Sequence, residues 1–362
     1  MNYQEFISPQ TQFFKLPQPF NLECGEVLFG VEVAYRTWGK LNSSGDNAVL
    51  ICHALTGGAD ASDWWEPLFG ANKAFDPEVD FIVCSNVLGS CYGTTGPISI
   101  NPQTNHIYGV GFPQITIRDM VNLQAVLIQA LKIQRIKLVV GGSLGGMQVL
   151  EWGLLYPDLV EAMAPIAVSG RHSAWCIGLS EAQRQAIYAD PNWLEGNYTL
   201  DKQPSQGLAV ARMMAMSTYR SWGSFENRFG RKQDLSEFAI SSYLQYQSQK
   251  FIERFDANTY ITLTHAMDSH DVARGRDNFA HVLSNVKKPT LVVAIDSDIL
   301  YPPHEQQELA TLIPNSKFAL VKSLHGHDAF LIDMSELNDL IVNFRRELAL
   351  HCRLGGGTEP NQ

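Results

Sequence analysis

One short segment limits what this 362-residue chain can fold into more than any other. An apolar run at 136–140 leads directly into the hexapeptide GGSLGG at 141–146, and apolar residues at helical spacing follow. This is a GxSxG sequence with a strand before it and a helix after it. A serine on such a sharp turn has strained backbone angles, needs small neighbours and exposes its hydroxyl beyond the strand. The segment therefore predicts that Ser143 is a nucleophile at the end of a sheet strand.

Two other interpretations of this glycine-rich turn are weaker. A GxSxG string also occurs by chance around a serine that has no chemical role, but the strand and the helix around Ser143 favour the catalytic interpretation. A phosphate-binding P-loop needs a Lys-Ser or Lys-Thr pair after its glycines, and none follows here.

Short apolar runs alternate with helical spacing along most of the chain, which is typical of a mainly parallel sheet with helices on both faces. After an antiparallel lead-in at 20–35, we expect buried strands at 48–52, 81–85, 136–140, 163–167, 290–294 and 317–321, covered on both sides. Helices are expected at 120–131, after Ser143, and at 337–348. Together with the serine turn, this order predicts an α/β-hydrolase fold with a sheet of roughly eight strands.

The middle of the chain has a different pattern. No convincing strand is found between 171 and 287, where Met-, Tyr- and Gln-rich helical segments occur, such as 208–218 and 238–255. We therefore predict an inserted helical lid within a catalytic α/β domain. The predicted division is 1–170 and 288–354 for the catalytic domain, 171–287 for the lid, and 355–362 for a disordered tail.

The partners of the serine follow it in the chain, in the order acid and then histidine. The strand expected at 290–294 leads to two aspartates, Asp296 and Asp298, and either could orient the histidine; Asp298 is favoured because it lies just before two prolines. After the next strand, His327 is favoured over His325 because a glycine precedes it and apolar residues follow. We predict Ser143 as nucleophile, His327 as general base and Asp298 as the orienting acid.

Two backbone N–H groups should stabilise the oxyanion that forms when the serine attacks. The N–H of Leu144, at the start of the helix, is one predicted donor. The N–H of Leu55, in the turn after the strand at 48–52, is the other. His53 begins that turn and is interpreted as a structural histidine. No metal site is predicted, because His325 and His327 are poorly spaced as chelators and no third ligand is evident.

The composition excludes several classes of function. The formal net charge is −10 and there is no Lys/Arg-rich run, so nucleic-acid binding is not expected. The first 18 residues lack the pattern of a secretory signal, and no apolar stretch is long enough to cross a membrane. Six scattered cysteines without a CxxC pair indicate a reducing, cytoplasmic setting. A local arginine could still bind an anionic ligand such as coenzyme A.

Several longer strings resemble the homoserine O-acetyltransferase family. They are HALTG at 53–57, CSNVLGSCYGTTGP at 84–97, GSLGGMQ at 142–148, ARM at 211–213, Asp298 with YP at 301–302, and GHDAF at 326–330. The likeness extends over about residues 35–348. It implies transfer of an acetyl group from acetyl-CoA to L-homoserine in methionine biosynthesis, by a homodimer packed through the lid, with no metal or tightly bound cofactor. GGAD at 57–60 departs from the GDAH of many members, which leaves the acyl donor open.

An amino-acid acceptor presents an ammonium and a carboxylate together. Asp328 could bind the ammonium, and Arg212 of the lid could bind the carboxylate with its guanidinium fork. The alternatives are an ion pair at a surface or between domains for Arg212, and a helix N-cap for Asp328. Tyr219 and Arg220 are weaker candidates from the lid.

Three rival functions stay open on the sequence alone. A plain hydrolase could use the same triad without needing Arg212 and Asp328 across the site from each other. A related acyltransferase could use succinyl-CoA or accept L-serine. A non-catalytic binding protein is the third, and the complete triad in the required order argues against it.

Overall fold

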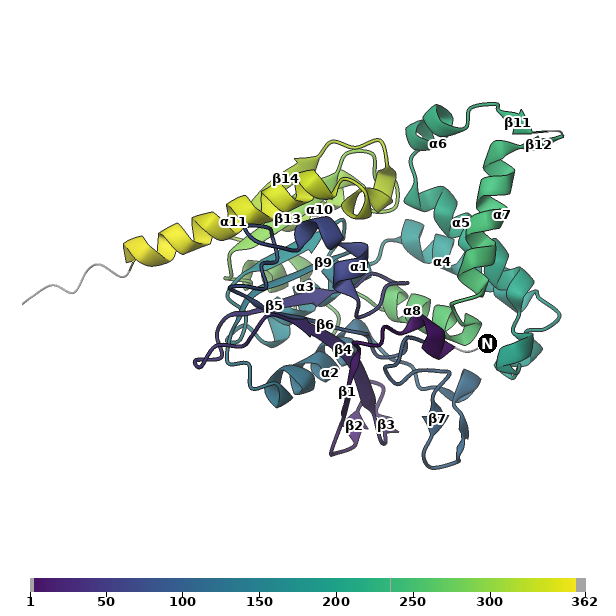
Figure 1. Cartoon of the computed structure of the whole chain (residues 1–362), viewed down its shortest axis with the longest axis horizontal. Helices are drawn as coiled ribbons and strands as arrows, with labels where there is room; N and C mark the ends of the chain where they lie inside the picture. Colours follow the sequence, from purple (N-terminus) through teal and green to yellow (C-terminus); the bar gives the residue numbers. More distant parts are fainter. Residues whose placement is uncertain (1–2, 235, 356–362) are drawn as a thin grey trace, which may run out of the picture.

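The computed structural model describes residues 3–234 and 236–355. Its centre is an eight-stranded sheet, and the expected α/β-hydrolase architecture is confirmed (Figure 1). The strands, in spatial order, are β1 (Gln12–Lys15), β4 (Glu32–Trp38), β6 (Phe81–Ser85), β5 (Ala48–Cys52), β9 (Ile136–Gly142), β10 (Met163–Ile166), β13 (Thr290–Ile295) and β14 (Ser316–Val321). Strands β6 to β14 in this order run parallel, and β4 is antiparallel to both of its neighbours.

The apolar core lies on both faces of this sheet, because successive side chains of a strand point to opposite faces. Leu50 of β5 packs in one cluster with Leu123 of α2 (Ile117–Ala130), and helices α3 (Leu144–Leu155) and α10 (Pro303–Leu312) contribute to the same cluster. Val49 packs in the other cluster with Ile341 of α11 (Met334–Gly355). The sheet is therefore held between two helical layers, as the sequence predicts.

The prediction that all six apolar strands are covered on both sides is wrong for β14. Phe318 and Leu320 on this strand are 36% and 40% exposed. Phe318 and Leu320 point to one face of the strand, whereas Ala319 and Val321 on the other face pack into the core, so β14 at the end of the sheet is covered on one face only. An apolar run predicts the strand but does not tell whether that strand lies at the centre or at the edge.

Between 171 and 287, helices dominate. They are α4 (Ala174–Tyr188), α5 (Ser205–Tyr219), α6 (Trp222–Arg228), α7 (Ala239–Ile252), α8 (Ala257–Asp268) and α9 (Phe279–Ser284). The expectation of no strand here missed a small pair, β11 (Gln233–Asp234) with β12 (Glu237–Phe238). In Figure 1, α5, α6 and α7 stand away from the sheet, whereas α8 lies closer to it. The exact division of the chain into catalytic domain and lid stays a prediction.

The remaining elements are short. They are the hairpin strands β2 (Phe20–Asn21) with β3 (Val27–Leu28) and β7 (Ile100–Asn101) with β8 (His106–Ile107), the helix α1 (Ala61–Trp64), and the 3-10 helices η1 (Tyr3–Phe6), η2 (Glu66–Leu68), η3 (Gly109–Gly111), η4 (Leu194–Gly196), η5 (Leu200–Lys202) and η6 (Gly326–Leu331). The hairpin β2–β3 forms the expected antiparallel lead-in. Apart from Gly355, where α11 ends, the predicted tail lies outside the described residues.

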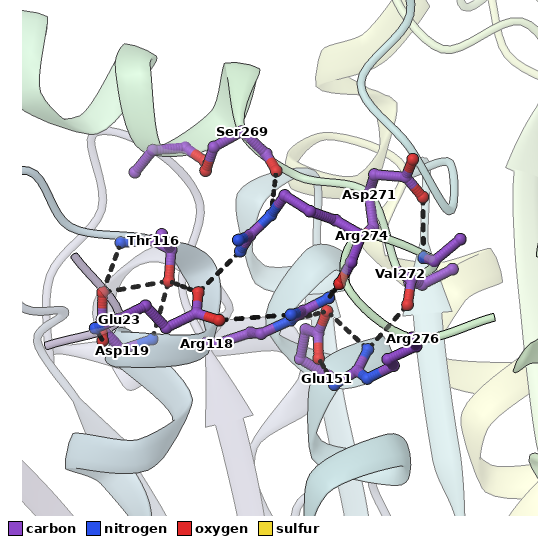
Figure 2. Close-up of polar contacts among 12 residues, drawn as sticks. Glu23, Thr116, Arg118, Asp119, Glu151, Ser269, Asp271, Val272, Arg274 and Arg276 are labelled. Atoms are coloured by element: carbon purple, nitrogen blue, oxygen red, sulfur yellow. Dashed lines mark hydrogen bonds and ion pairs between the residues drawn. The ribbon is translucent and has the colours of Figure 1, made fainter. Parts of the chain in front are cut away.

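A buried polar cluster fixes the end of the helical segment to the sheet domain (Figure 2). Glu151 of α3 is 1% exposed and accepts hydrogen bonds from Arg276 at 2.6 Å and from Arg118 of α2 at 3.2 Å. Arg274 pairs with Glu23 of the β2–β3 turn at 2.7 Å. Removing the buried Glu151 carboxylate would take from Arg118 and Arg276 the acid that they share, at a cost of about 3–5 kcal/mol. The cluster therefore holds the returning chain against α3, the helix whose first turn follows the predicted nucleophile.

Candidate active site

Ser143 occupies the sharp turn between β9 and α3, in a strained backbone conformation with φ 57° and ψ −123°. Its N–H is fixed by a 3.0 Å hydrogen bond to the carbonyl of Ile166 on the neighbouring strand β10. The flanking glycines are required by space: a Cβ on Gly141 would lie 2.6 Å from the carbonyl oxygen of Cys52, and one on Gly145 would clash with the same atom. Such strain persists only where the surrounding structure enforces it, which is typical of a functional site.

The histidine and the acid are joined by a hydrogen bond. His327 of η6 donates from Nδ1 to Asp298 Oδ2 at 2.7 Å, and both residues are 3% exposed. The other oxygen of Asp298 accepts from the N–H groups of Leu300 at 2.8 Å and Tyr301 at 3.0 Å. The aspartate is thus held by its own loop, and it fixes the histidine in the tautomer that leaves Nε2 free to act as a base.

Ser143 and His327 line the same cavity, which has a volume of about 660 Å³. The predicted residues Leu55, Arg212 and Asp328 line it too, so the structure brings together side chains from four distant parts of the chain. Asp298 lies behind the histidine ring. The arrangement can carry out nucleophilic attack on an acyl carbon, with proton transfer through the histidine.

The charges around His327 set its basicity. Burial lowers the pKa of the imidazole, but the Asp298 carboxylate, by charge and by hydrogen bond, and the Asp328 carboxylate raise it more strongly. The net result is a pKa above the ordinary histidine value of 6.5. His327 is therefore poised to accept a proton and to be stabilised as the imidazolium.

Of the two predicted oxyanion donors, Leu55 lines the cavity and Leu144 directly follows Ser143 in the chain. Leu144 is the first residue of α3, so its N–H has no acceptor within the helix. Leu55 lies in the turn after β5. His53 anchors that turn as a structural histidine: its Nδ1 donates to the Ala54 carbonyl at 2.8 Å and its Nε2 accepts from the Val87 N–H at 3.0 Å. Burial lowers the pKa of His53 to about 4, so it is neutral.

Arg212 of α5 is a cation without an anion. Its guanidinium carbon lies 4.8 Å from the ring centroid of Phe251 and 5.7 Å from that of Tyr219. Nε and Nη1 are buried and have no hydrogen-bond partner, and Arg212 takes part in no ion pair among the described residues. The alternative of an ion pair at a surface or between domains is therefore not observed. A buried donor without an acceptor is costly, and an anionic ligand in the cavity would satisfy it.

Asp328 has a partner that the sequence ranked low. Its Oδ2 lies 3.1 Å from Nε of Arg220, and both residues line the cavity. Burial raises the pKa of Asp328, while Arg220, His327 and Arg212 act to lower it. Asp328 lies inside η6 and not at its N-cap, so the capping alternative is not observed. Tyr219, the other weaker candidate, also lines the cavity, with its ring 5.8 Å from that of His327.

The residues that the sequence ranked second have other roles. Asp296 accepts a hydrogen bond from the Ser323 N–H at 2.9 Å and braces the loop. Nδ1 of His325 lies 3.5 Å from Oγ of Ser224, and His325 does not line the cavity. Sequence reasoning missed Arg254, which lines the cavity from the loop between α7 and α8; only its positive charge within the helical segment could have suggested it.

Comparison with known proteins identifies the family. A family model described as the alpha/beta hydrolase fold matches residues 47–333. The homoserine O-acetyltransferase of Nostoc punctiforme is 72% identical over 94% of this chain and 98% of its own length. That of Trichormus variabilis is 70% identical over 97% of this chain and 98% of its own length.

The chain belongs to the homoserine O-acetyltransferase family. Among solved structures, the homoserine O-acetyltransferase from Bacillus anthracis matches with a TM-score of 0.87 and 27% identity, covering 92% of this chain and 97% of that one. An esterase matches almost as well, with a TM-score of 0.86 and 27% identity over 92% of this chain and 99% of its own. Backbone similarity thus does not separate transferases of this family from hydrolases, whereas sequence identity to the relatives does.

Proposed function

We propose that this chain transfers an acetyl group from acetyl-CoA to the hydroxyl of L-homoserine through an acetyl-enzyme on Ser143. One observation carries the proposal: the unpaired guanidinium of Arg212 lies in the same cavity as Ser143 and His327. A hydrolase that releases its acyl group to water has no need of a buried, unsatisfied cation there. The identity of 72% to a homoserine O-acetyltransferase supports the same acceptor.

The first half-reaction acetylates the enzyme. His327 takes the proton of the Ser143 hydroxyl while its oxygen attacks the thioester carbonyl. The N–H groups of Leu55 and Leu144 hold the oxyanion, and Asp298 stabilises the imidazolium. The carbon–sulfur bond then breaks, and the imidazolium returns its proton to the sulfur, so free coenzyme A leaves.

The second half-reaction regenerates the serine. L-homoserine binds with its carboxylate on Arg212 and its ammonium at Asp328, beside Arg220. Its hydroxyl gives its proton to His327 and attacks the acetyl carbon, and the proton passes to the departing Ser143 oxygen. Two fixed charges hold the acceptor against the ester at high effective concentration, so it outcompetes water.

No resident metal or cofactor is included in this proposal. The two steps balance with acetyl-CoA as a co-substrate, since the acyl group, the protons and the leaving thiol are all accounted for. Among the described residues no group of three or more His, Cys, Asp or Glu side chains is arranged to hold a metal ion. None of the helices in the described ranges has both the length and the apolar character needed to cross a membrane.

We also propose that the chain forms a homodimer through the helical segment and acts in the cytoplasm. Apolar side chains are exposed on three neighbouring helices: Val210 (42%) and Met214 (39%) on α5, Trp222 (80%) on α6 and Tyr246 (55%) on α7. We take these exposed side chains to form the interface between copies, since exposed apolar surface is often covered by a partner. The five cysteines whose side chains the structure describes are free, which agrees with a reducing compartment. Sedimentation velocity should show a dimer at micromolar concentration, and a monomer would contradict this part of the proposal.

Mass spectrometry of the intact protein tests the reaction. After brief exposure to acetyl-CoA the chain should gain one acetyl group, and L-homoserine should remove it as O-acetyl-L-homoserine. The Ser143→Ala variant should gain no acetyl group. Ser217 is an exposed serine of α5, so the Ser217→Ala variant should be acetylated like the wild-type protein. Without an acyl-enzyme the mechanism fails. Loss of the acetyl group to water at the same rate would indicate a hydrolase, and acylation by succinyl-CoA or release by L-serine would indicate the related transferases.

A further inference from the structure

The turn that carries the predicted oxyanion donor Leu55 is held at several points. The carbonyl of His53 accepts from the side-chain amide of Gln148 on α3 at 3.3 Å. The carbonyl of Ala54 accepts twice, from Nδ1 of His53 at 2.8 Å and from the N–H of Gly57 at 2.9 Å. These contacts come from the turn itself and from the nucleophile helix, so they build the turn within the sheet domain.

One contact to this turn comes from the helical segment. Nη1 of Arg254, between α7 and α8, donates to the carbonyl of Thr56 at 3.1 Å, and the same nitrogen donates to the hydroxyl of Tyr92. Arg254 and Thr56 are 198 residues apart in the chain. Arg254 also lines the cavity with Ser143, so this cation acts on the turn from inside the active site.

The hydrogen bonds from Arg254 form a continuous chain that ends at Leu55. The Thr56 carbonyl shares its peptide group with the Gly57 N–H, and the Gly57 N–H donates to the Ala54 carbonyl at 2.9 Å. That carbonyl in turn shares its peptide group with the Leu55 N–H. Hydrogen bonds in such a chain orient and polarise one another, more strongly in a site of low dielectric constant.

The guanidinium groups of Arg254 and Arg212 both lie over the ring of Phe251. Their guanidinium carbons are 5.3 Å and 4.8 Å from the centroid of Phe251, which is 1% exposed. Arg254 is bonded to protein acceptors, whereas Nε and Nη1 of Arg212 have none. The same residue type on the same support therefore has two different electrostatic tasks.

We infer that Arg254 is a positioning residue, whose charge acts through two peptide groups to orient and polarise the Leu55 N–H toward the oxyanion. This inference rests on the proposed acetyl-enzyme and on Leu55 as a donor. The oxyanion develops in both half-reactions, when acetyl-CoA acylates Ser143 and when the acceptor releases the acetyl group. Loss of the Arg254 charge should therefore slow both steps. A residue that binds only the acceptor should affect only the second.

The test measures the two steps separately, by rapid quenching and intact-protein mass spectrometry. Arg254→Met keeps an apolar stem and removes every donor. We expect acetylation by acetyl-CoA and release by L-homoserine each to slow about 10- to 100-fold, less than the roughly 10²- to 10³-fold loss when an oxyanion donor is removed altogether. KM values for both substrates should change by less than about threefold, and the fraction of chains that can be acetylated should stay the same, which separates positioning from unfolding.

Two further variants complete the design. The side chain of Arg254→Gln can still donate to Thr56 but has no charge, so both of its rates should lie between those of the wild-type protein and those of Arg254→Met. If the methionine variant does not fold, the glutamine variant provides the test. Tyr92→Phe removes the other acceptor of Arg254 Nη1, and the rates of both steps should stay within about threefold of the wild-type rates. Slowing of one step alone, a raised KM with unchanged kcat, or no effect of the glutamine variant would overturn the inference. If the unchanged chain forms no acetyl-enzyme, the proposed function fails instead.

Discussion

The two sides of the cavity differ in how completely their polar groups are paired. On the side of the sheet domain, Asp298 accepts from two N–H groups and from His327, so acid and base are fixed before any substrate arrives. On the side of the helical segment, Arg212 lies on an aromatic ring with two buried nitrogens that have no partner. One side is complete in itself, and the other lacks an anion.

This difference separates catalysis from binding. Groups that stabilise a transition state work best when they are already oriented and need no rearrangement during the reaction. A group that selects a ligand can instead be left unsatisfied, because a ligand without the matching anion then leaves a buried charge unpaired. Arg254 differs from Arg212: it is hydrogen-bonded to the protein, and it contacts the turn of the sheet domain that carries Leu55.

Asp298→Asn removes the acid of the sheet-domain side and should have the largest effect on activity. The amide cannot hold the imidazole in the required tautomer or stabilise its charged form, so we expect kcat to fall about 10⁴-fold. The KM for L-homoserine should change little, because Arg212 and Asp328 are untouched. Asp296→Asn is the matched control two residues away and should keep most of the activity, since Asp296 only braces the loop. Steady-state kinetics decides, and a larger loss in the control would reverse the assignment of the acid.

Arg212→Met should disturb the binding side alone. Losing a charged hydrogen-bond donor to the acceptor carboxylate should raise the KM for L-homoserine about 10- to 100-fold and leave that for acetyl-CoA nearly unchanged. The free energy of unfolding should not fall, because the substitution removes donors that lack acceptors. Arg184→Met is the control: this buried arginine of α4 pairs with Asp268 at 2.7 Å, so its loss should lower the melting temperature while KM stays the same. Equal changes in both KM values would contradict the acceptor site.

The sheet side was the more predictable of the two. Strands β5 and β6 have the bounds expected from their apolar runs, 48–52 and 81–85, because a fully buried strand needs an unbroken apolar sequence. Ser143 was predictable since its turn tolerates few residues other than glycine around it. His327 and Asp298 followed from chain order, because consecutive parallel strands present their loops at the same edge of the sheet.

The helical side was less predictable, for a physical reason. Which arginine is paired depends on contacts between residues far apart in the chain, and no local pattern encodes them. Nε of Arg220 lies 3.1 Å from Oδ2 of Asp328, and Arg254 donates to the Thr56 carbonyl. The sequence around either arginine does not indicate which residue is its partner. The edge position of β14 was missed for the same reason, since strand order is a tertiary property.

The smallest effect should appear where the two sides meet, at Asp328. Its backbone belongs to the sheet domain and its partner Arg220 to the helical segment. The Asp328 carboxylate is one of the groups that raise the pKa of His327, because a nearby negative charge stabilises the imidazolium.

Asp328→Asn should therefore lower the pKa of His327, so the neutral base persists to lower pH. The acid limb of the pH–rate profile for acetylation by acetyl-CoA should move to lower pH, and measuring this step alone avoids any effect on acceptor binding. Asp333→Asn, whose carboxylate accepts from the Ser323 hydroxyl, removes a charge that is not among those acting on His327 and should leave the profile in place. A shift of the acid limb to higher pH would mean that Asp328 does not act on the histidine as an anion, and the charge coupling between the two sides would have to be rejected.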